Sequence, residues 1–482
     1  MQITIGQILT QDGQRIIVPV FAYDKMGIEH QYLVSCGCRT AVLDEDKQCE
    51  EAIPQRVHIH AIGGRRLAET VHYAAIAYPF RGERLEETIS LKLYFQFNTT
   101  ERMITLIEQL YWDNLSRWYQ QGRTIKAEMS LPQFYSRWLA LPPTLLADRA
   151  HWQSQIATIC EKALAISVTS ISYSDQNLAF KQPDKDPELQ EKSLVYYPNL
   201  ANFLTESRLA GSGNVQWGIV HGNITAETVL VDPANQTWLI DFAHVGRAPL
   251  LCDFVMLETA VKLTLFNSLD FDMKHVVERR FANVASLKDK ISREWLSVEA
   301  HQLVELIEKI RKLADELAGC SLQSYLGGLF FCAVCEIHRF ETGTRHTRRA
   351  FMPFVSALMS ASVIANVLLV YEGREVAIEQ IQERLWLDVD NYDVRVEGQK
   401  IEVTPQEFEL LKYLYENADR VCSREEVHTF VFSGEIETKY DPVVDDGRLN
   451  SAISRLRQKL EKVSNHEFIT TVRGRGYKLI LS

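Results

Sequence analysis

Hydrophobic residues recur at helical spacing near the carboxy-terminus of the chain. From Leu449 to Leu460 apolar side chains return every third or fourth position, and basic side chains fall on a different face of the same helix. Two short runs with strand character follow, Phe468 to Thr471 and Tyr477 to Leu481, and an Arg-Gly-Arg-Gly sequence joins them. The pattern predicts a helix with an apolar back and a basic front, followed by a β-hairpin with two arginines at its tip.

Strand patterns and helix caps precede this helix. Residues 385–403 alternate as three short strands, and two capping boxes follow them, Thr404 to Glu407 and Ser423 to Glu426. A capping box predicts the start of a helix because its side chains satisfy backbone N–H groups that the first turn leaves unpaired. The predicted order is a sheet, two helices, a long acidic loop at residues 432–446, the basic helix and the hairpin.

This order resembles the winged helix-turn-helix output domain of OmpR/PhoB-type response regulators, over roughly residues 384–482. The runs Ile453 to Leu460 and Thr471 to Tyr477 carry the resemblance most closely. It implies double-stranded DNA as a partner, with the basic helix in the major groove and the hairpin on the neighbouring backbone or minor groove. In this family the loop at 432–446 can touch RNA polymerase, and a homodimer on DNA is a further expectation. The implied DNA-binding residues are Arg448, Ser451, Arg455, Arg457, Lys459, Thr471, Arg473, Arg475 and Tyr477.

The amino-terminal third of the chain has strand character. Residues 1–36 contain three runs of period-two alternation, and Gln11 to Gly13 supplies one of the turns between them. A helix at Leu43 to Ile53 and a strand at His72 to Tyr78 follow. The pattern predicts a small antiparallel sheet accompanied by one helix.

The middle of the chain is mostly helical by periodicity. Met103 to Leu141 and Val261 to Gly373 repeat apolar residues at helical spacing, whereas Ser167 to Val195 loses the period and predicts an inserted loop or a small β segment. Residues 218–258 contain a strand, a His-Gly turn, a loop and a short apolar strand that ends in Ile-Asp-Phe.

This arrangement resembles the aminoglycoside phosphotransferase and choline kinase branch of the protein kinase-like fold, over about residues 1–370. Similar kinase-like domains occur among the ternary-complex-associated modules proposed for bacterial conflict systems. The resemblance implies a small β-rich lobe, a helical large lobe and the remnant of a catalytic loop at 218–258. The residues of that remnant are His221, Asn223, Thr228 and Asp241.

Several residues depart from what phosphoryl transfer needs. Asn223 stands where the family has the aspartate that accepts the proton of the attacking hydroxyl, and an amide cannot accept it near neutral pH. Thr228 replaces an asparagine that holds a metal ion, and Ser35 stands near the place of the strand lysine, with Arg39 as the nearest cation. The first turn offers only Gly13 for a close approach to phosphates. The departures predict that catalysis has been lost.

Asp241 matches the remaining metal-binding aspartate of the family. Two interpretations are open. In one, His221 and Asp241 brace the loop through hydrogen bonds. In the other, Asp241 retains a metal ion and with it an Mg-nucleotide. No other cofactor is predicted. Asp253, with Glu258 beyond it, resembles the acidic pair that packs the following helix in some bacterial members.

Composition and charge narrow the class of protein. With 482 residues, 46% hydrophobic and 24% charged, the chain is globular and long enough for two to four domains. A net charge of -11 excludes indiscriminate nucleic-acid binding by the whole chain, so the basic residues after Val443 form a local positive field. Met1 to Gly6 lacks the basic start and long apolar run of a signal peptide, which predicts a cytoplasmic protein.

Two further segments carry alternatives. Cys36 with Cys38, and Cys332 with Cys335, could each supply half of a zinc site, but neither has a second pair near it in sequence, which favours buried thiols. Phe354 to Tyr371 has about the length of a membrane span. Its serines and an asparagine favour a buried core helix instead, so no membrane partner is predicted.

The sequence therefore predicts an α+β protein in which a two-lobed kinase-like fold precedes a winged helix-turn-helix domain. The expected divisions are a small lobe at 1–100, a large lobe at 101–373, a stiff linker at 374–384 and the winged domain at 385–482. The leading hypothesis is a DNA-binding transcriptional regulator whose sensor is a pseudokinase, in place of the phosphorylatable receiver that usually precedes this output domain. The alternatives are an active ATP-dependent phosphotransferase coupled to a DNA-binding domain, and a scaffold in a bacterial defence system.

Overall fold

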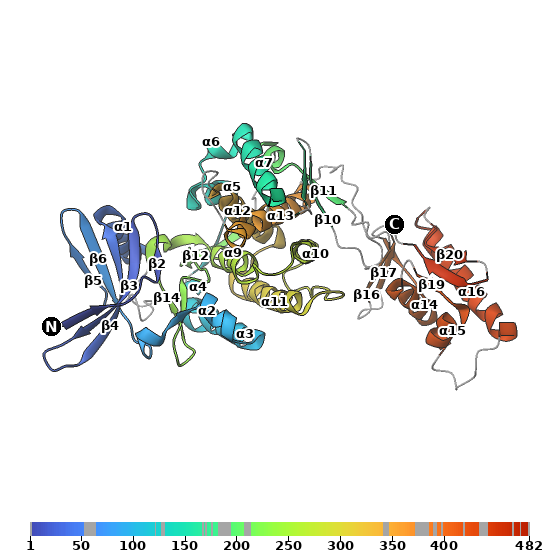
Figure 1. The fold of residues 1–482 in the computed structure, drawn as a ribbon, viewed down its shortest axis with the longest axis horizontal. Coiled ribbons are helices and arrows are strands. Elements are labelled where there is room, and N and C mark those ends of the chain that lie inside the picture. The colour runs from blue at the N-terminus through green and yellow to red at the C-terminus, as the bar shows by residue number, and fades with distance from the viewer. Residues whose placement is uncertain are drawn as a thin grey trace. The chain divides into compact units, whose positions relative to one another are not determined.

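The chain forms two compact units, Met1–Ala377 and Ile378–Ser482. The computed structural model describes most of each unit (Figure 1). The predicted linker at 374–384 lies outside the described residues, which are 2–52, 64–120, 122–126, 131–165, 168, 171–174, 177–181, 194–206, 214–340, 347–371, 385–388, 393–396, 399–417, 420–432, 442–464, 467–472 and 474–480.

A six-stranded antiparallel sheet begins the first unit, as the alternation in residues 1–36 predicts. Its strands pair in the order β1-β3-β4-β6-β5, and β2 pairs with β3 (Figure 1). Alternate residues of paired strands face the same side, so Ile17, Leu33 and Ile76 are buried together, and Val42 of α1 (Arg39–Ala52) packs with them. The strands are β1 (Gln2–Ile5), β2 (Thr10–Gln11), β3 (Arg15–Tyr23), β4 (Glu29–Cys38), β5 (Arg66–Glu69) and β6 (Tyr73–Pro79).

Smaller sheets lie further along the first unit. In the described residues they pair in the orders β15-β12-β8, β14-β13-β7 and β11-β10-β9. The last of them confirms the small β segment predicted between Ser167 and Val195. The strands are β7 (Ile89–Ser90), β8 (Arg123–Lys126), β9 (Ile171–Tyr173), β10 (Asn177–Lys181), β11 (Leu194–Pro198), β12 (Asn214–Val220), β13 (Val229–Val231), β14 (Thr237–Leu239) and β15 (Gly246–Pro249).

The prediction of helix throughout Met103 to Leu141 is wrong at β8. This strand pairs antiparallel with β12, from Lys126 opposite Asn214 to Arg123 opposite Trp217. The segment Arg-Thr-Ile-Lys contains the β-branched residues Thr124 and Ile125. A strand forms because β12 offers an edge to pair with, which outweighs the weaker local preference for helix.

Helices make up most of the remaining described residues of the first unit, and α12 packs against both α9 and α13 in its core (Figure 1). The α-helices are α2 (Leu91–Phe97), α3 (Thr100–Gln109), α4 (Ser116–Tyr119), α5 (Leu131–Trp138), α6 (Pro143–Leu146), α7 (Arg149–Ala165), α8 (Leu200–Glu206), α9 (Leu251–Ala260), α10 (Phe271–Ala282), α11 (Val298–Ala318), α12 (Leu322–His338) and α13 (Arg348–Tyr371). Shorter turns are η2 (Leu85–Glu87), η3 (Leu110–Leu115), η4 (Phe242–His244) and η5 (Val261–Leu265).

A buried ion network joins three of these helices. Glu258 of α9 accepts hydrogen bonds from Nε and Nη2 of Arg311 of α11 at 3.0 and 2.8 Å. Lys262 lies 3.4 Å from Glu258 and 2.8 Å from Glu278 of α10. Arg311 and Lys262 hold the pKa of the buried Glu258 carboxyl below its usual value, against the opposing effect of burial. Glu258, one of the two acidic residues predicted to pack the following helix, is therefore paired with Arg311 and Lys262.

Helix α13 contains the apolar segment for which a membrane span was the alternative. The stretch Arg348–Leu369 is long and apolar enough to cross a membrane, yet 83% of its most apolar window is buried inside the protein. Its packing partners include α12 and α10, which agrees with the prediction of a core helix.

The second unit contains two small sheets and three helices in its described residues, around a core of its own. Thr404 caps α14 with the predicted capping box: its hydroxyl accepts a hydrogen bond from the N–H of Glu407, and the Glu407 carboxylate accepts one from the N–H of Thr404. The elements are β16 (Leu385–Asp388), β17 (Asp393–Val396), β18 (Gln399–Ile401), α14 (Pro405–Glu416), β19 (Val421–Cys422), α15 (Arg424–Phe432), α16 (Pro442–Glu461), β20 (Ile469–Val472) and β21 (Gly476–Leu479).

The loop predicted at residues 432–446 is shorter than expected. Phe432 ends α15 and α16 begins at Pro442, so the last five positions of the expected loop are helical. Proline favours the first helical position because its missing N–H would have no partner there, and Asp445 in the first turn complements the helix dipole.

Candidate functional site

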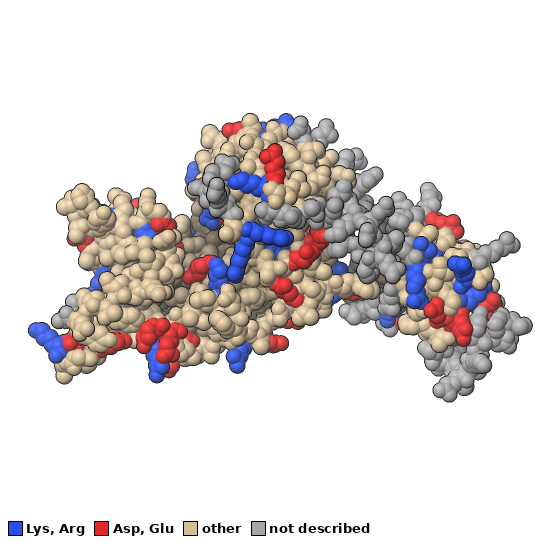
Figure 2. Space-filling view, in the orientation of Figure 1, with Lys and Arg blue, Asp and Glu red and all other residues tan. Residues whose placement is uncertain are grey.

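Helix α16 has the two faces that its sequence pattern predicts. Leu449, Ile453, Leu456 and Leu460 are at most 1% exposed and face the core of the second unit. The opposite face carries exposed polar and basic side chains. Figure 2 shows Lys and Arg side chains gathered on the visible face of this unit where Figure 1 draws α16, with acidic side chains beside them. Of the DNA-binding residues that the resemblance implies on α16, three are exposed: Arg448, Ser451 and Arg455.

Two basic residues of α16 point toward their own unit. Nε of Arg457 donates to the carbonyl of Ile469 at 2.7 Å, and its Nη2 donates to the Thr471 hydroxyl at 2.8 Å. Nζ of Lys459 lies 2.6 Å from the carboxylate of Glu407. The charge of Lys459 and a backbone N–H hold the pKa of Glu407 below its usual value, although burial opposes this. Arg457 and Lys459 thus position α16 against β20 and α14.

A hydrogen bond joins the hairpin to the middle of α16. Tyr477 is 1% exposed, and its hydroxyl donates to Oδ1 of Asn450 at 2.5 Å. The guanidinium of Arg424 lies 5.2 Å from the centre of the Tyr477 ring and forms an ion pair with Asp446 at 3.0 Å. Sequence reasoning missed Arg424 and Asn450 because only the fold brings α15, α16 and β21 together.

The hairpin between β20 and β21 turns tightly, and glycine is required at its base. The N–H of Arg475 donates to the carbonyl of Val472 at 2.9 Å, and Gly476 has a φ of 138°. A Cβ at Gly476 would collide with the carbonyl oxygen of Cys422. Arg475 is exposed at this turn. Arg473, the other arginine predicted at the tip, lies outside the described residues.

In the first unit a buried carboxylate holds the His-Gly turn. Asp253 accepts hydrogen bonds from the N–H of His221 at 3.0 Å and of Gly222 at 2.8 Å, and from the Tyr119 hydroxyl at 2.8 Å. Asp253 is fully buried, and burial raises its pKa to about 6, whereas the three hydrogen bonds favour the charged form. Gly222 has a φ of 79°, and a Cβ there would collide with the carbonyl of His244.

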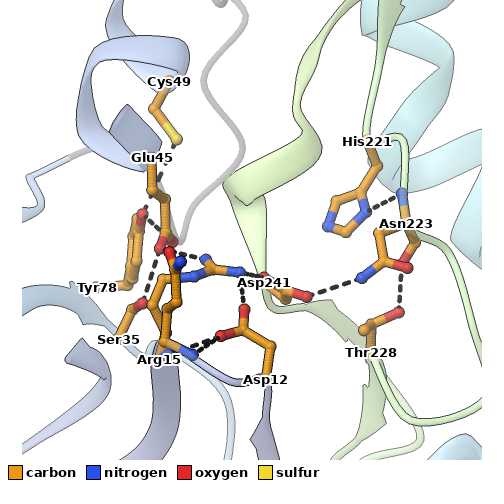
Figure 3. A network of polar contacts seen from close by, with 11 residues as sticks. Asp12, Arg15, Ser35, Glu45, Cys49, Tyr78, His221, Asn223, Thr228 and Asp241 are labelled. Carbon is orange, nitrogen blue, oxygen red and sulfur yellow. Dashed lines mark hydrogen bonds and ion pairs between the residues drawn. The ribbon is translucent and has the colours of Figure 1, made fainter. Parts of the chain in front are cut away.

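The predicted catalytic-loop residues lie close together and bond to one another (Figure 3). Nδ2 of Asn223 donates to Oδ2 of Asp241 at 2.7 Å. The Thr228 hydroxyl donates to the carbonyl of Asn223 at 2.6 Å. Burial lowers the pKa of His221 to about 4, which keeps its ring neutral, and Nδ1 accepts from the N–H of Asn223 at 3.4 Å. These contacts are the kind that brace a loop.

Among the described residues, Arg15 is the cation that forms an ion pair with Asp241. Its Nη1 lies 2.8 Å from Glu45, and its Nη2 lies 2.5 Å from Asp12 and 3.1 Å from Asp241 (Figure 3). The expectation that Arg39 is the nearest cation is wrong, because Arg39 forms an ion pair with Glu69 at the surface, at 2.8 Å. Arg15 shares a strand face with the buried Ile17, and an arginine at an inward position is the signal that sequence reasoning overlooked.

The residues around Asp241 do not fit a divalent metal ion as they stand. Oδ1 faces the guanidinium of Arg15, and Oδ2 accepts the amide hydrogen of Asn223. An amide that donates toward a carboxylate turns its positive end to the site, and the Thr228 hydroxyl is bonded to backbone. Within the described ranges, no group of three or more His, Cys, Asp or Glu residues is arranged to hold a metal.

The paired cysteines differ in their surroundings. Cys332 and Cys335 are buried in α12, and burial raises the pKa of both thiols. Cys38 is exposed at the end of β4, and Cys36 is partly buried. All nine cysteines are free.

Comparisons with known proteins concern the second unit. Residues 398–479 match the family described as "Transcriptional regulatory protein, C terminal". The response regulator ArlR of Staphylococcus saprophyticus is 36% identical over 91 residues, which are 19% of this chain and 39% of that protein. The transcriptional regulatory protein ResD of Bacillus subtilis is 36% identical over 100 residues, 20% of this chain and 38% of that protein. The chain thus spans about two fifths of the length of these relatives.

Solved structures similar to the chain cover the same share of it. The DNA-binding domain of CpxR from E. coli is 32% identical, covers 20% of this chain and 91% of that domain, and has a TM-score of 0.17. The Klebsiella pneumoniae RstA DNA-binding domain in complex with the RstA box is 27% identical, covers 20% of this chain and 92% of that domain, and has a TM-score of 0.18. The family match and the relatives support the prediction of an OmpR/PhoB-type winged helix DNA-binding domain at the carboxy-terminus.

Proposed function

We propose that this chain, whose carboxy-terminal unit is an OmpR/PhoB-type winged helix domain, binds duplex DNA and regulates transcription in the cytoplasm. One observation carries the proposal. Helix α16 buries its apolar face in the core of its unit and leaves Arg448, Ser451 and Arg455 exposed on the opposite face. A major groove admits one α-helix, and exposed arginines can reach phosphates and guanine edges there.

The other predicted DNA-binding residues divide by their surroundings. Arg475 is exposed on the hairpin, which suits contact with the phosphate backbone. Thr471 is also exposed there, and its hydroxyl accepts a hydrogen bond from Arg457. Arg457, Lys459 and Tyr477 have partners within their own unit, and we assign them to positioning the helix and hairpin. Arg473 is retained as a candidate of the hairpin from the sequence alone.

Fluorescence anisotropy of the full chain with labelled fragments from its own genome tests the proposal. We expect binding that weakens as salt rises, and an Arg455→Ala/Arg475→Ala variant with at least about ten-fold lower affinity and a shallower salt dependence. An Arg39→Ala variant, which removes an exposed ion pair of the first unit, should bind like wild type. Binding that is indifferent to both salt and the double substitution would instead support the scaffold alternative.

We further propose that the first unit is a kinase-like sensor that does not transfer phosphate. The order of sheet, α1, His-Gly turn and Asp241 supports the likeness. Asn223 at the place of the catalytic base, Thr228 bonded to backbone and Arg15 against Asp241 support the loss of phosphate transfer.

Contact with RNA polymerase near residues 432–446 and dimerisation on DNA belong to the proposal for the winged helix domain. Residues 433–441 lie outside the described residues.

The rival function is an active ATP-dependent phosphotransferase. Incubation of the full chain with Mg-ATP, followed by measurement of released or transferred phosphate, separates the two. We expect no turnover above that of an Asp241→Ala variant. Turnover that Asp241→Ala abolishes and Asp113→Ala, a change at an exposed carboxylate, preserves would establish the rival.

A further inference from the structure

The guanidinium of Arg15 lies where three carboxylates converge. Its Nη2 contacts both Asp12 and Asp241, and its Nη1 contacts Glu45. The Arg15 side chain is 7% exposed and that of Glu45 is fully buried. Because three carboxylates share one guanidinium, the site retains an excess of negative charge. This charge repels a phosphate group and favours a cation.

The backbone holds Arg15 at this place. Asp12 accepts the N–H groups of Gln14 and Arg15 at 2.8 and 2.7 Å, which closes the turn that precedes β3. The N–H of Cys38 donates to the carbonyl of Gln14 at 2.8 Å. Gly37 lies opposite Arg15 in the strand pair, and a Cβ there would collide with the backbone of Gln14. The turn is therefore packed onto β4, and it presents the guanidinium to Asp241.

Neighbouring hydrogen bonds fix the orientation of the partner carboxylate on α1. Glu45 accepts the hydroxyls of Ser35 at 2.7 Å and Tyr78 at 2.8 Å (Figure 3). Ser35 is the residue near the place where the phosphotransferase resemblance expects a lysine. A serine there leaves Glu45 without a strand cation, and Arg15 supplies the positive charge from the preceding strand.

We infer that Arg15 is a tethered counter-cation that takes the place of a divalent ion at Asp241. Its Nη2 marks a point within reach of one oxygen of Asp12 and one of Asp241. Divalent ions bind such oxygens at about 2.0–2.6 Å, so removal of the guanidinium creates a cation site that the natural chain fills with its own side chain. The inference rests on residues 12–241 and does not depend on the proposal for DNA.

Titration of the full chain with Mn²⁺ at pH 7 tests this assignment. The electron paramagnetic resonance signal of the free ion measures how much Mn²⁺ remains unbound. Wild type should leave millimolar Mn²⁺ free. Arg15→Gln should bind the ion at least about ten-fold more tightly, because it removes the competing positive charge while keeping a polar side chain. Arg15→Lys should behave like wild type, since an ammonium restores the charge. Arg15→Gln/Asp241→Asn should lose the gain.

Thermal unfolding supplies a second readout that does not require a fully stable variant. Mn²⁺ should raise the unfolding midpoint of Arg15→Gln and leave that of wild type unchanged, because a ligand that binds only the folded state stabilises it. Arg39→Gln, which breaks an exposed ion pair near the same sheet, should show no response to Mn²⁺.

Three outcomes would overturn the inference. The first is wild-type binding of Mn²⁺ that Asp241→Asn abolishes. The second is an Arg15→Gln protein that unfolds cooperatively yet gains no Mn²⁺ affinity. The third is an Arg15→Gln protein that is unfolded and that Mn²⁺ does not rescue. DNA binding measured on the same samples reports on the second unit, so failure here is distinguishable from failure of the proposed function.

Discussion

Arg15 and Arg455 carry the same guanidinium in opposite surroundings. Arg15 is almost fully buried among Asp12, Glu45 and Asp241. Arg455 is exposed on α16, whose other face is packed into the core of its unit. The charge of Arg15 is thus neutralised by partners within the first unit, whereas the charge of Arg455 is exposed to solvent. The comparison teaches that charge counts say little about function until each charge is assigned a partner.

The same contrast separates residues that stabilise the protein from residues that bind. A buried charge that loses its partner keeps its desolvation cost, so its removal is felt in stability. An exposed arginine stays hydrated when the protein folds, so its removal changes stability little and lowers the affinity for the binding partner instead.

Asp253→Ala should have the largest effect, on the stability of the first unit. It removes the acceptor of two backbone N–H groups and the Tyr119 hydroxyl, all buried. Leaving buried donors unsatisfied costs roughly 1–3 kcal/mol each, so a loss of at least about 3 kcal/mol is expected from chemical unfolding of the full chain. Asp113→Ala, at an exposed position, is the control and should change stability little. An Asp253→Ala protein of wild-type stability would refute the role assigned to this carboxylate.

The same carboxylate should make stability depend on pH. Burial raises the pKa of Asp253 to about 6, above about 3.9 in the unfolded chain. The folded state then binds the proton more tightly, so this contribution to stability is fully present below pH about 4 and is lost as pH rises through about 6. The free energy of unfolding of wild type relative to Asp253→Asn should fall by up to about 3 kcal/mol across this window. A difference that stays constant between pH 4 and 7 would show that hydrogen bonding outweighs burial at Asp253.

Arg455→Ala should lower DNA affinity about ten-fold, or about 1.4 kcal/mol, and leave the unfolding midpoint unchanged, because the side chain is exposed. Lys459→Ala is the matched variant on the same helix. Its ammonium is paired with the buried Glu407, so its loss should be felt in stability more than in affinity. Anisotropy and thermal unfolding on both variants measure the two effects. The reverse assignment, with Arg455 controlling stability and Lys459 controlling affinity, would break the comparison.

Thr404→Ala should have the smallest effect, about 1 kcal/mol on the second unit alone. The substitution removes the side-chain acceptor of the capping box that starts α14. Thr404→Ser keeps the hydroxyl and should restore most of the lost stability. Hydrogen exchange of α14 against that of α9 measures whether the loss is confined to one unit. A matching loss of protection in α9 would mean that the two units do not unfold independently.

The parts of the fold that could be predicted from the sequence depend on local chemistry. The apolar face from Leu449 to Leu460 and the capping box at Thr404 each depend on residues within a few positions of one another. Both therefore form where the sequence predicts them. The pairing of Arg15 with Asp241, and of Lys459 with Glu407, joins positions far apart in the chain. Such pairs depend on strand register and helix packing, which side-chain periodicity does not specify.

The same reason explains the missed strand and the mistaken cation. Strand β8 forms because β12 pairs with it, and the residues next to Arg123–Lys126 do not indicate that pairing. Arg39 was chosen because it is close in sequence to Ser35, whereas Arg15 is close in space through the β3–β4 pairing. The predicted residues His221, Asn223 and Thr228 belong to one loop, between β12 and β13. The antiparallel pairing of β13 with β14 then returns the chain, so that Asp241 lies beside Asn223.

The hydrogen bond from Tyr477 to Asn450 fixes the spacing between the hairpin and α16. In the proposed complex the DNA duplex would therefore adjust its groove width to this spacing. Sequences whose grooves already have a matching width would then be favoured even at base pairs that no side chain reaches.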